Sequence, residues 1–145
     1  MTSHVRRYHR HHRSSGHVWQ GRFKAFPIEA DDHLLVALRY VERNALRAGL
    51  VGSGGRAEDW PWTSLRWVGK RTKPSWLREL PVDRPRRWRE LVNAPQTDDE
   101  EQAMRHCIAR GTPYGEAAWV ERIARRLGLE STLRPRGRPR KNPEK

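Results

Sequence analysis

The chain has 145 residues, enough for one domain or for a small core with tails. Hydrophobic residues make up only 35%, and 30 basic against 17 acidic residues leave a formal net charge of +13. No apolar run is long enough to span a membrane, and a single cysteine excludes an internal disulfide. These features predict a soluble intracellular protein, with Cys107 as a buried thiol in a helical pattern.

The positive charge comes mostly from arginine, since 25 of the basic residues are Arg and 5 are Lys. The guanidinium is a planar fork of donors that suits phosphate groups and stacks on bases. This surplus favours a nucleic acid partner. The alternative, which explains part of the surplus, is the arginine bias of a GC-rich coding sequence.

The chain begins with a basic segment, residues 1–18, that contains five histidines, four arginines and no acid. Its sequence predicts no helix start, and it is typical of the end of an element whose beginning is missing. The next stretch, VWQGRFKAFPI at 18–28, favours a short strand that stops at Pro27. A single strand needs a partner for its backbone groups, in this chain or in another.

A helix is predicted from about His33, capped by Asp31 or Asp32, to Gly49. Its expected apolar face, at about 100° per residue, consists of Leu34, Leu38, Val41, Ala45 and Ala48. Away from that face lies a polar stripe of His33, Tyr40, Asn44 and Arg47, in which Tyr40 and Asn44 are one turn apart. Two interpretations of Tyr40 remain open at this point: a tyrosine at the edge of the core, or a nucleophile with Asn44 as a metal ligand.

The loop GSGGRAED follows, and then WPWTSLRW, whose three tryptophans are expected to fold back over this helix. Residues 69–96 contain prolines at 74, 81, 85 and 95, which predict an irregular basic connector with a short helix around Trp88. The segment 1–68 is therefore interpreted as one partial domain, and residues 69–96 as the irregular connector that follows it.

Two helices are predicted within residues 97–130, one with acids in its first turn and Gly111 past its end, the other ending at Gly128. They form either a helix-turn-helix that reads DNA or a helical hairpin that binds nothing.

Residues 131–145 are predicted from their composition to be disordered. Their PRGRPRK stretch has an AT-hook core, in which basic side chains reach along an A/T-rich minor groove beside Gly137; these are Arg136, Arg138, Arg140 and Lys141. Short Arg/Pro tails also arise easily in basic proteins.

Four stretches in order, SGHVWQGRFKAFPI, LRYVERNALRAGLV, AEDWPWTSL and LGLESTLRPRGRPRK, resemble the REP-associated tyrosine transposases, a family of single-tyrosine HUH transposases of bacterial insertion sequences. In that family a helix bears the nucleophile in a segment Y-[VI]-x-x-N-P-[VL]-[RK]-x-G. The resemblance implies Tyr40 as nucleophile and Asn44 as metal ligand for Mg²⁺ or a similar divalent cation. Ala45 stands where the family has proline.

The family's other two metal ligands are a pair of histidines around one hydrophobic residue, on an upstream strand. Here only His9 and His11 have that spacing, with Arg10 between them, too close to Tyr40. The chain is therefore expected to start inside the catalytic domain, with an incomplete metal site. The histidines at 9, 11, 12 and 17 are interpreted as a solvated basic cluster.

The resemblance implies an α+β fold, mainly helical here: the C-terminal part of a ferredoxin-like domain, with one strand and the Tyr40 helix. It implies a bacterial, cytoplasmic and nucleoid-associated protein that cleaves and rejoins single-stranded hairpin DNA through a 5′-phosphotyrosine, as a monomer or as a homodimer, with cleavage impaired. Predicted phosphate contacts, which are otherwise a solvated charged face, are Arg22, Lys24, Arg39, Arg43 and Arg47. The alternatives are a non-catalytic DNA-binding module and a decayed reading frame whose product barely folds.

Overall fold

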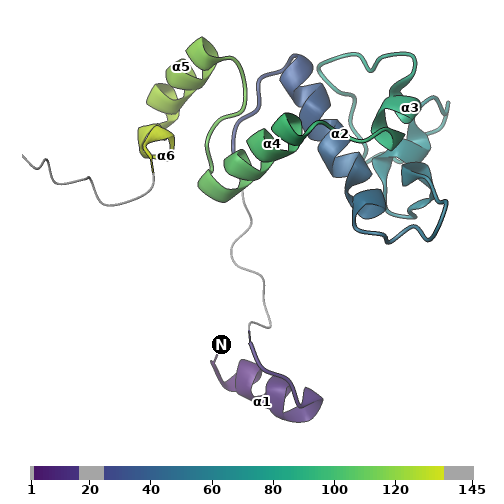
Figure 1. Cartoon of the computed structure of the whole chain (residues 1–145), viewed down its shortest axis with the longest axis vertical. Coiled ribbons are helices and arrows are strands. Elements are labelled where there is room, and N and C mark those ends of the chain that lie inside the picture. The colour runs from purple at the N-terminus through teal and green to yellow at the C-terminus, as the bar shows by residue number, and fades with distance from the viewer. Residues whose placement is uncertain (1, 17–24, 136–145) are drawn as a thin grey trace, which may run out of the picture.

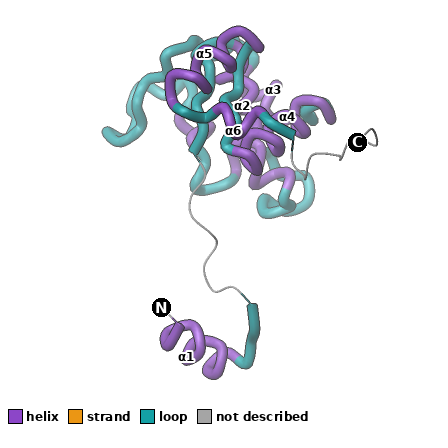
Figure 2. Tube along the Cα trace, turned by 90° about the vertical axis from the view of Figure 1, so that its left-hand side faces the viewer, coloured by secondary structure: helices purple, strands orange, loops and turns teal. Residues whose placement is uncertain are grey.

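The computed structural model describes residues 2–16 and 25–135, and the regular elements in these ranges are helical (Figure 1). They are α1 Thr2–His12, α2 Asp32–Arg47, η1 Ala57–Asp59, η2 Ser64–Trp67, α3 Trp88–Asn93, α4 Asp98–Arg110, α5 Ala117–Leu127 and α6 Glu130–Leu133. The prediction of a mainly helical chain is confirmed. Helix α1 lies apart from the other helices in both views (Figures 1 and 2).

Helix α2 starts and ends where its sequence predicts. The carboxylate of Asp31 accepts the backbone N–H of His33 at 2.8 Å, which satisfies one of the free donors of the first turn. At the other end, the Ala48 N–H donates to the Asn44 carbonyl at 2.9 Å, and Gly49 follows with φ of 70°. A positive φ costs glycine little, so Gly49 lets the chain leave the helix.

The buried face of α2 differs from the expected one. Val41 is 66% exposed, whereas Glu42 beside it is only 3% exposed and Arg39 only 9%. The prediction is therefore wrong for Val41 and for Ala48, which are exposed, although it is confirmed for Ala45, which is buried. The reason is that both charged side chains find hydrogen-bond partners inside the protein, and a pattern that counts apolar residues alone cannot register this.

Glu42 is the polar centre of the core. One carboxylate oxygen accepts from Ser64 Oγ at 2.6 Å and from Arg84 Nη2 at 3.1 Å, and the other accepts from Trp88 Nε1 at 2.7 Å. These donors come from η2, from the chain before α3 and from α3 itself. The carboxylate on α2 therefore joins two stretches that lie further along the chain, η2 and residues 84–88.

The apolar core surrounds this carboxylate and is built from four fully buried residues, Ala57, Leu65, Trp88 and Val92. Half-buried side chains that pack against it are Leu35, Leu38, Leu46 and Val68. The predicted short helix around Trp88 is confirmed as α3, but residues 69–96 are more than a connector, because this stretch supplies half of the core. Trp62 folds back toward α2 as expected, where it lines a hollow with Val41 and Ala45, but its side chain stays 85% exposed.

The predicted ends of α4 and α5 are confirmed. Thr97 and Glu100 form a reciprocal capping box, Gly111 follows α4 with φ of 71°, and Gly128 follows α5 with φ of 66°. Cys107 is buried in α4, and burial raises the pKa of its thiol. As a pair the helices differ from the expected hairpin, because α4 packs against α2 whereas α5 packs against α6 (Figure 1).

In place of a strand, the described part of the 18–28 stretch makes one parallel bridge between Ile28 and Tyr114. The Tyr114 N–H donates to the Pro27 carbonyl, and the Glu29 N–H donates to the Tyr114 carbonyl, both at 2.9 Å. The turn after α4 thus supplies the backbone partner. Within 2–16 and 25–135 there is no sheet of the ferredoxin type.

The described helices also bear on membrane association. None of them combines the length and the apolar character that a membrane span requires.

Candidate functional site

The structure brings Tyr40, Asn44 and Arg47 together on the surface of α2, as their spacing predicts. Arg47 Nη2 donates to the Tyr40 phenol oxygen at 3.2 Å and to Asn44 Oδ1 at 2.9 Å. The guanidinium carbon lies 4.8 Å from the centre of the Tyr40 ring, which adds a cation–π contact. Tyr40 and Asn44 are thus connected through the cation of Arg47.

Helix α4 closes one side of this group. Arg47 Nη1 lies 3.4 Å from the Glu101 carboxylate, which also pairs with Arg105 at 2.8 Å. We call the five residues Tyr40, Asn44, Arg47, Glu101 and Arg105 the Tyr40 cluster. Two cations and one anion leave the cluster positive, and the paired Glu101 holds the Arg47 guanidinium near the phenol.

The Tyr40 cluster does not fit a Mg²⁺ site at Asn44. Magnesium takes oxygen ligands in a near-octahedral shell, and it is bound through one or more carboxylates. The Asn44 oxygen already accepts from Arg47, and a divalent cation there would meet a positive guanidinium. The nearest carboxylate in the cluster, Glu101, is paired with Arg47 and Arg105.

One group in the described ranges has ligand atoms close enough for a metal, within 4.8 Å of one another: Glu29, Asp31 and His33. Each acid has a structural hydrogen bond, Asp31 to His33 and Glu29 to the Glu116 N–H at 2.8 Å. The backbone N–H of His33 lowers the pKa of Asp31. Tyr40 follows His33 by seven positions, which correspond to about 10 Å of helix, so this group lies outside the Tyr40 cluster.

In α1, the ring nitrogens of His9 are engaged locally. Nδ1 lies 2.9 Å from Ser14 Oγ and Nε2 lies 2.8 Å from the Gly16 carbonyl. The rings of His11 and His12 contact each other edge to face. His17 lies outside the described residues.

Arg39 points into the protein. Its Nε donates to the Leu91 carbonyl at 2.9 Å, and its Nη2 donates to the carbonyls of Ala94 at 3.1 Å and Pro95 at 2.7 Å. Its Nη1 pairs with Glu100 at 3.2 Å. All three nitrogens are therefore occupied, two of them at the end of α3 and the third in the first turn of α4.

Arg43 uses the same helix end. Its Nη1 donates to the carbonyls of Val92 at 3.1 Å and Asn93 at 2.6 Å. The last carbonyls of a helix lack partners within it and carry partial negative charge, so the two guanidiniums satisfy and neutralise this end. Burial, and the neighbouring Arg39, lower the pKa of Arg43. Arg39 and Arg43 thus hold α3 against α2, a structural role that neither sequence interpretation included.

The remaining predicted DNA contacts fall outside the described residues. They are Arg22 and Lys24 before α2, and Arg136, Gly137, Arg138, Arg140 and Lys141 in the tail.

Exposed basic side chains that were not among the candidates gather where η2 meets α3. Arg66, Lys70 and Arg89 line one hollow together with Glu58, and Arg86, Arg87 and Arg89 line the next. We call Arg66, Lys70, Arg86, Arg87 and Arg89 the basic patch. Two of its members are positioned by backbone carbonyls, Arg66 by Pro61 at 3.2 Å and Arg89 by Val68 at 2.7 Å. The DRPRRWRE run at 83–90 is the sequence signal that would have indicated it.

Comparisons of the chain with protein-family models, with curated proteins and with solved structures find no significant match. The likeness to REP-associated tyrosine transposases therefore rests on the four stretches of sequence alone.

Proposed function

We propose that the chain binds DNA, and that its preferred ligand is single-stranded hairpin DNA, as the likeness to REP-associated tyrosine transposases implies. The observation that carries the proposal is the basic patch, in which five exposed cations from η2, α3 and the residues that flank them share one region of surface. Phosphate neutralisation by Lys and Arg supplies most of the sequence-independent affinity for nucleic acid. Binding of this kind needs no metal.

The finer features of the family belong to the same proposal. The described residues are then the helical remainder of a ferredoxin-like catalytic domain, whose sheet another polypeptide segment or a second copy of the chain provides. The protein acts in the bacterial cytoplasm at the nucleoid. The basic tail that contains Gly137 adds a contact with A/T-rich minor grooves.

A second candidate function, strand cleavage by Tyr40, is supported by the hydrogen bond from Arg47 to the phenol oxygen. In this reaction the phenol oxygen forms a bond to phosphorus and the bond to the 3′-oxygen breaks, which leaves a 5′-phosphotyrosine. The phenol loses its proton and the 3′-oxygen gains one. Arg47 would bind the phosphate and offset the charge that develops on it.

Retention of labelled hairpin DNA from repeats near the gene tests the binding proposal. Three substitutions together, Arg66→Gln, Lys70→Gln and Arg89→Gln, should weaken binding and lower the slope of log affinity against log salt by about 2, because single strands contribute about 0.7 per phosphate. The matched control, Arg122→Gln, Arg125→Gln and Arg126→Gln in α5, removes the same charge from exposed positions elsewhere. Equal losses in both triple variants would show that binding follows net charge and not the basic patch.

The Tyr40→Phe variant separates the two functions. It removes the phenol oxygen but keeps the ring, so DNA retention should stay unchanged while any adduct that survives denaturing detergent disappears. The assay is run with Mg²⁺ and with a chelator. An adduct of equal yield in Tyr40→Phe would rule out Tyr40 as the nucleophile, and loss of the wild-type adduct in chelator would show that cleavage needs a divalent cation.

A further inference from the structure

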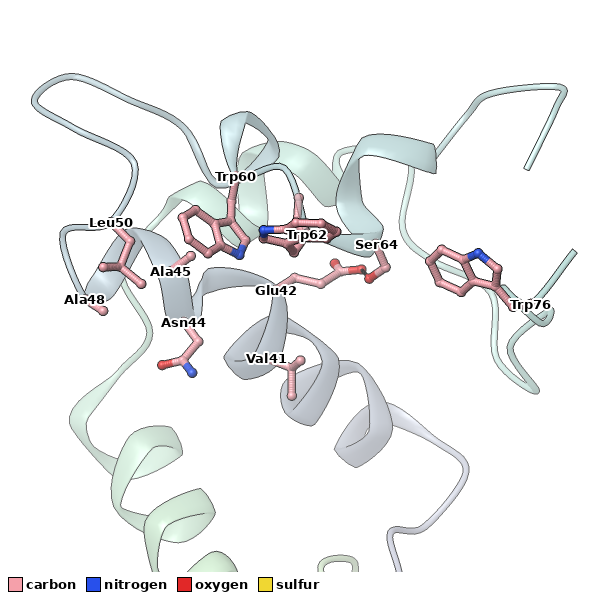
Figure 3. A pocket seen from close by; sticks show the side chains of 11 residues that line it. Val41, Glu42, Asn44, Ala45, Ala48, Leu50, Trp60, Trp62, Ser64 and Trp76 are labelled. Carbon is pink, nitrogen blue, oxygen red and sulfur yellow. Dashed lines mark hydrogen bonds between the residues drawn. The ribbon is translucent and has the colours of Figure 1, made fainter. Parts of the chain in front are cut away.

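An open hollow of about 320 Å³ lies between α2 and the segment 60–64 (Figure 3). Trp60 and Trp62 lie over α2 in this view, and Trp76 stands beside Ser64. Trp62 is 85% exposed and Trp76 is 71% exposed. We call this site the tryptophan hollow.

The floor of the tryptophan hollow adds two further features. Val41 and Leu50 are exposed apolar side chains that widen the apolar surface. Asn44 lines the same hollow, and its Oδ1 accepts from Arg47, so its Nδ2 is left without a partner among the described residues. An exposed apolar surface of this kind, rimmed by a polar donor, marks an interaction site.

We propose that the tryptophan hollow binds an unpaired nucleobase of single-stranded DNA, which stacks on its exposed indole rings. This inference rests on the proposed DNA binding and names the part of the DNA that this surface recognises. Every base has a π-face, so stacking on tryptophan accepts any sequence, and a single-strand site combines such rings with nearby cations.

The cation nearest to this site along α2 is Arg47, whose 2.9 Å hydrogen bond to Asn44 connects it to a residue that lines the hollow. Of its five N–H donors, three are used by Tyr40, Asn44 and Glu101, which leaves two for a phosphate within the described structure. A nucleotide whose base occupies the hollow therefore has a donor for its phosphate next to the Tyr40 phenol.

Charge favours DNA over an apolar protein surface as the occupant. The chain carries +13, and the carboxylate of Glu42 that lines the hollow is neutralised by Arg84 at 3.1 Å. The net positive charge of the chain attracts a polyanion, whereas it repels a second copy of the same chain. A neutral apolar segment would gain nothing from Arg47.

The experiment measures binding of a fluorescent oligothymidine and of an abasic strand of equal length and charge. Trp62→Ala should weaken binding of oligothymidine about tenfold and leave binding of the abasic strand unchanged, because only the first ligand has bases to stack. Trp62→Tyr keeps an aromatic ring and should retain most of the affinity. The control is Leu127→Ala, which removes an exposed apolar side chain from α5 and should leave both affinities unchanged.

The outcomes separate the two proposals. If the wild type retains neither ligand, the proposed DNA binding fails. If the wild type and Trp62→Ala bind oligothymidine with equal affinity, and likewise the abasic strand, the proposed DNA binding stands and the proposed nucleobase site is wrong. Sedimentation of the same variants adds a third outcome: a wild-type dimer that Trp62→Ala converts to monomer, with unchanged affinity for DNA, would make the hollow a contact between copies and overturn the proposal.

Discussion

Three arginines spaced four residues apart on α2 have different tasks. Arg39 and Arg43 donate to backbone carbonyls at the end of α3, whereas Arg47 contacts the phenol of Tyr40 and the amide of Asn44 at the surface. Each step of four residues turns a side chain about 40° around the helix axis, so Arg47 lies about 80° from Arg39. The net charge therefore overestimates the positive charge that is available to a nucleic acid, because some arginines are used in contacts within the protein.

The same contrast separates neighbours on α2. Glu42 is buried among three donors, and Val41 beside it is exposed at the tryptophan hollow. The inner side of the helix is held by polar contacts, and the outer side carries apolar surface. We infer that the inner side fixes the fold and the outer side is available for a ligand, and the following predictions test this division.

The largest effect is expected for Glu42→Ala. This change leaves the half-buried Arg84 cation and the buried Trp88 N–H without their partner, so the free energy of unfolding should fall by about 3–5 kcal/mol. The reference is Val41→Ala on the outer side, which should change it by less than about 0.5 kcal/mol. Urea unfolding followed by tryptophan fluorescence measures both. Similar losses for the two variants would contradict the division into inner and outer sides.

The next effect is expected for Arg39→Lys. A lysine keeps the charge but has one nitrogen in place of three, and it cannot serve the carbonyls of Leu91 and Pro95 together with Glu100. The unfolding free energy should fall by about 2 kcal/mol, as expected for carbonyls left unpaired in the interior.

Arg47→Lys is the matched comparison for this change, because it makes the same substitution two turns later on the surface. It should change the unfolding free energy by less than about 0.5 kcal/mol, as is usual for exposed ion pairs. A loss at Arg47 as large as that at Arg39 would mean that the Tyr40 cluster is part of the structural framework.

The helix ends were predictable from the sequence, because caps are local. Asp31, Thr97, Gly111 and Gly128 each act within a few residues of the element that they bound. The burial of Arg39 was not predictable, since its carbonyl partners lie more than 50 residues away along the chain. Periodicity treats every arginine as solvated, and only the folded chain shows where the unpaired carbonyls are.

The candidate site follows the same rule. The grouping of Tyr40, Asn44 and Arg47 follows from helical spacing, but the contribution of Glu101 from α4 does not. The metal ligand role of Asn44 came from the family likeness, and the local charge does not fit it. The tryptophan hollow was missed because a run of three tryptophans is expected to be core, and the exposure of Trp62 is decided by tertiary packing.

On the outer side, Arg47→Ala should weaken binding of single-stranded DNA a few-fold and lower the salt slope by about 0.7, the value for one lost phosphate contact. Arg43→Gln removes a charge from the same helix and should leave both quantities unchanged in the folded fraction, because its donors face α3. Salt titrations of fluorescence anisotropy measure the two variants side by side. An equal change in slope would show that the charge of α2 acts as a whole.

The smallest effect concerns acid and the start of α2. The His33 N–H lowers the pKa of Asp31 below its ordinary value of 3.8, so the ionised form is favoured in the folded state. The resulting stabilisation is present above pH of about 4 and is lost as the pH falls through the lowered value.

Asp31→Asn keeps a capping oxygen but does not titrate, so its urea midpoint should fall less than that of the wild type between about pH 4 and pH 2. Asp32→Asn removes the same charge without touching the bond to His33, and it isolates the capping contribution. If the urea midpoint depends on pH in the same way for the wild type and for Asp31→Asn, the N-terminus of α2 is already frayed in the folded protein. The two sides of the helix would then be held in place by α3 and the core alone.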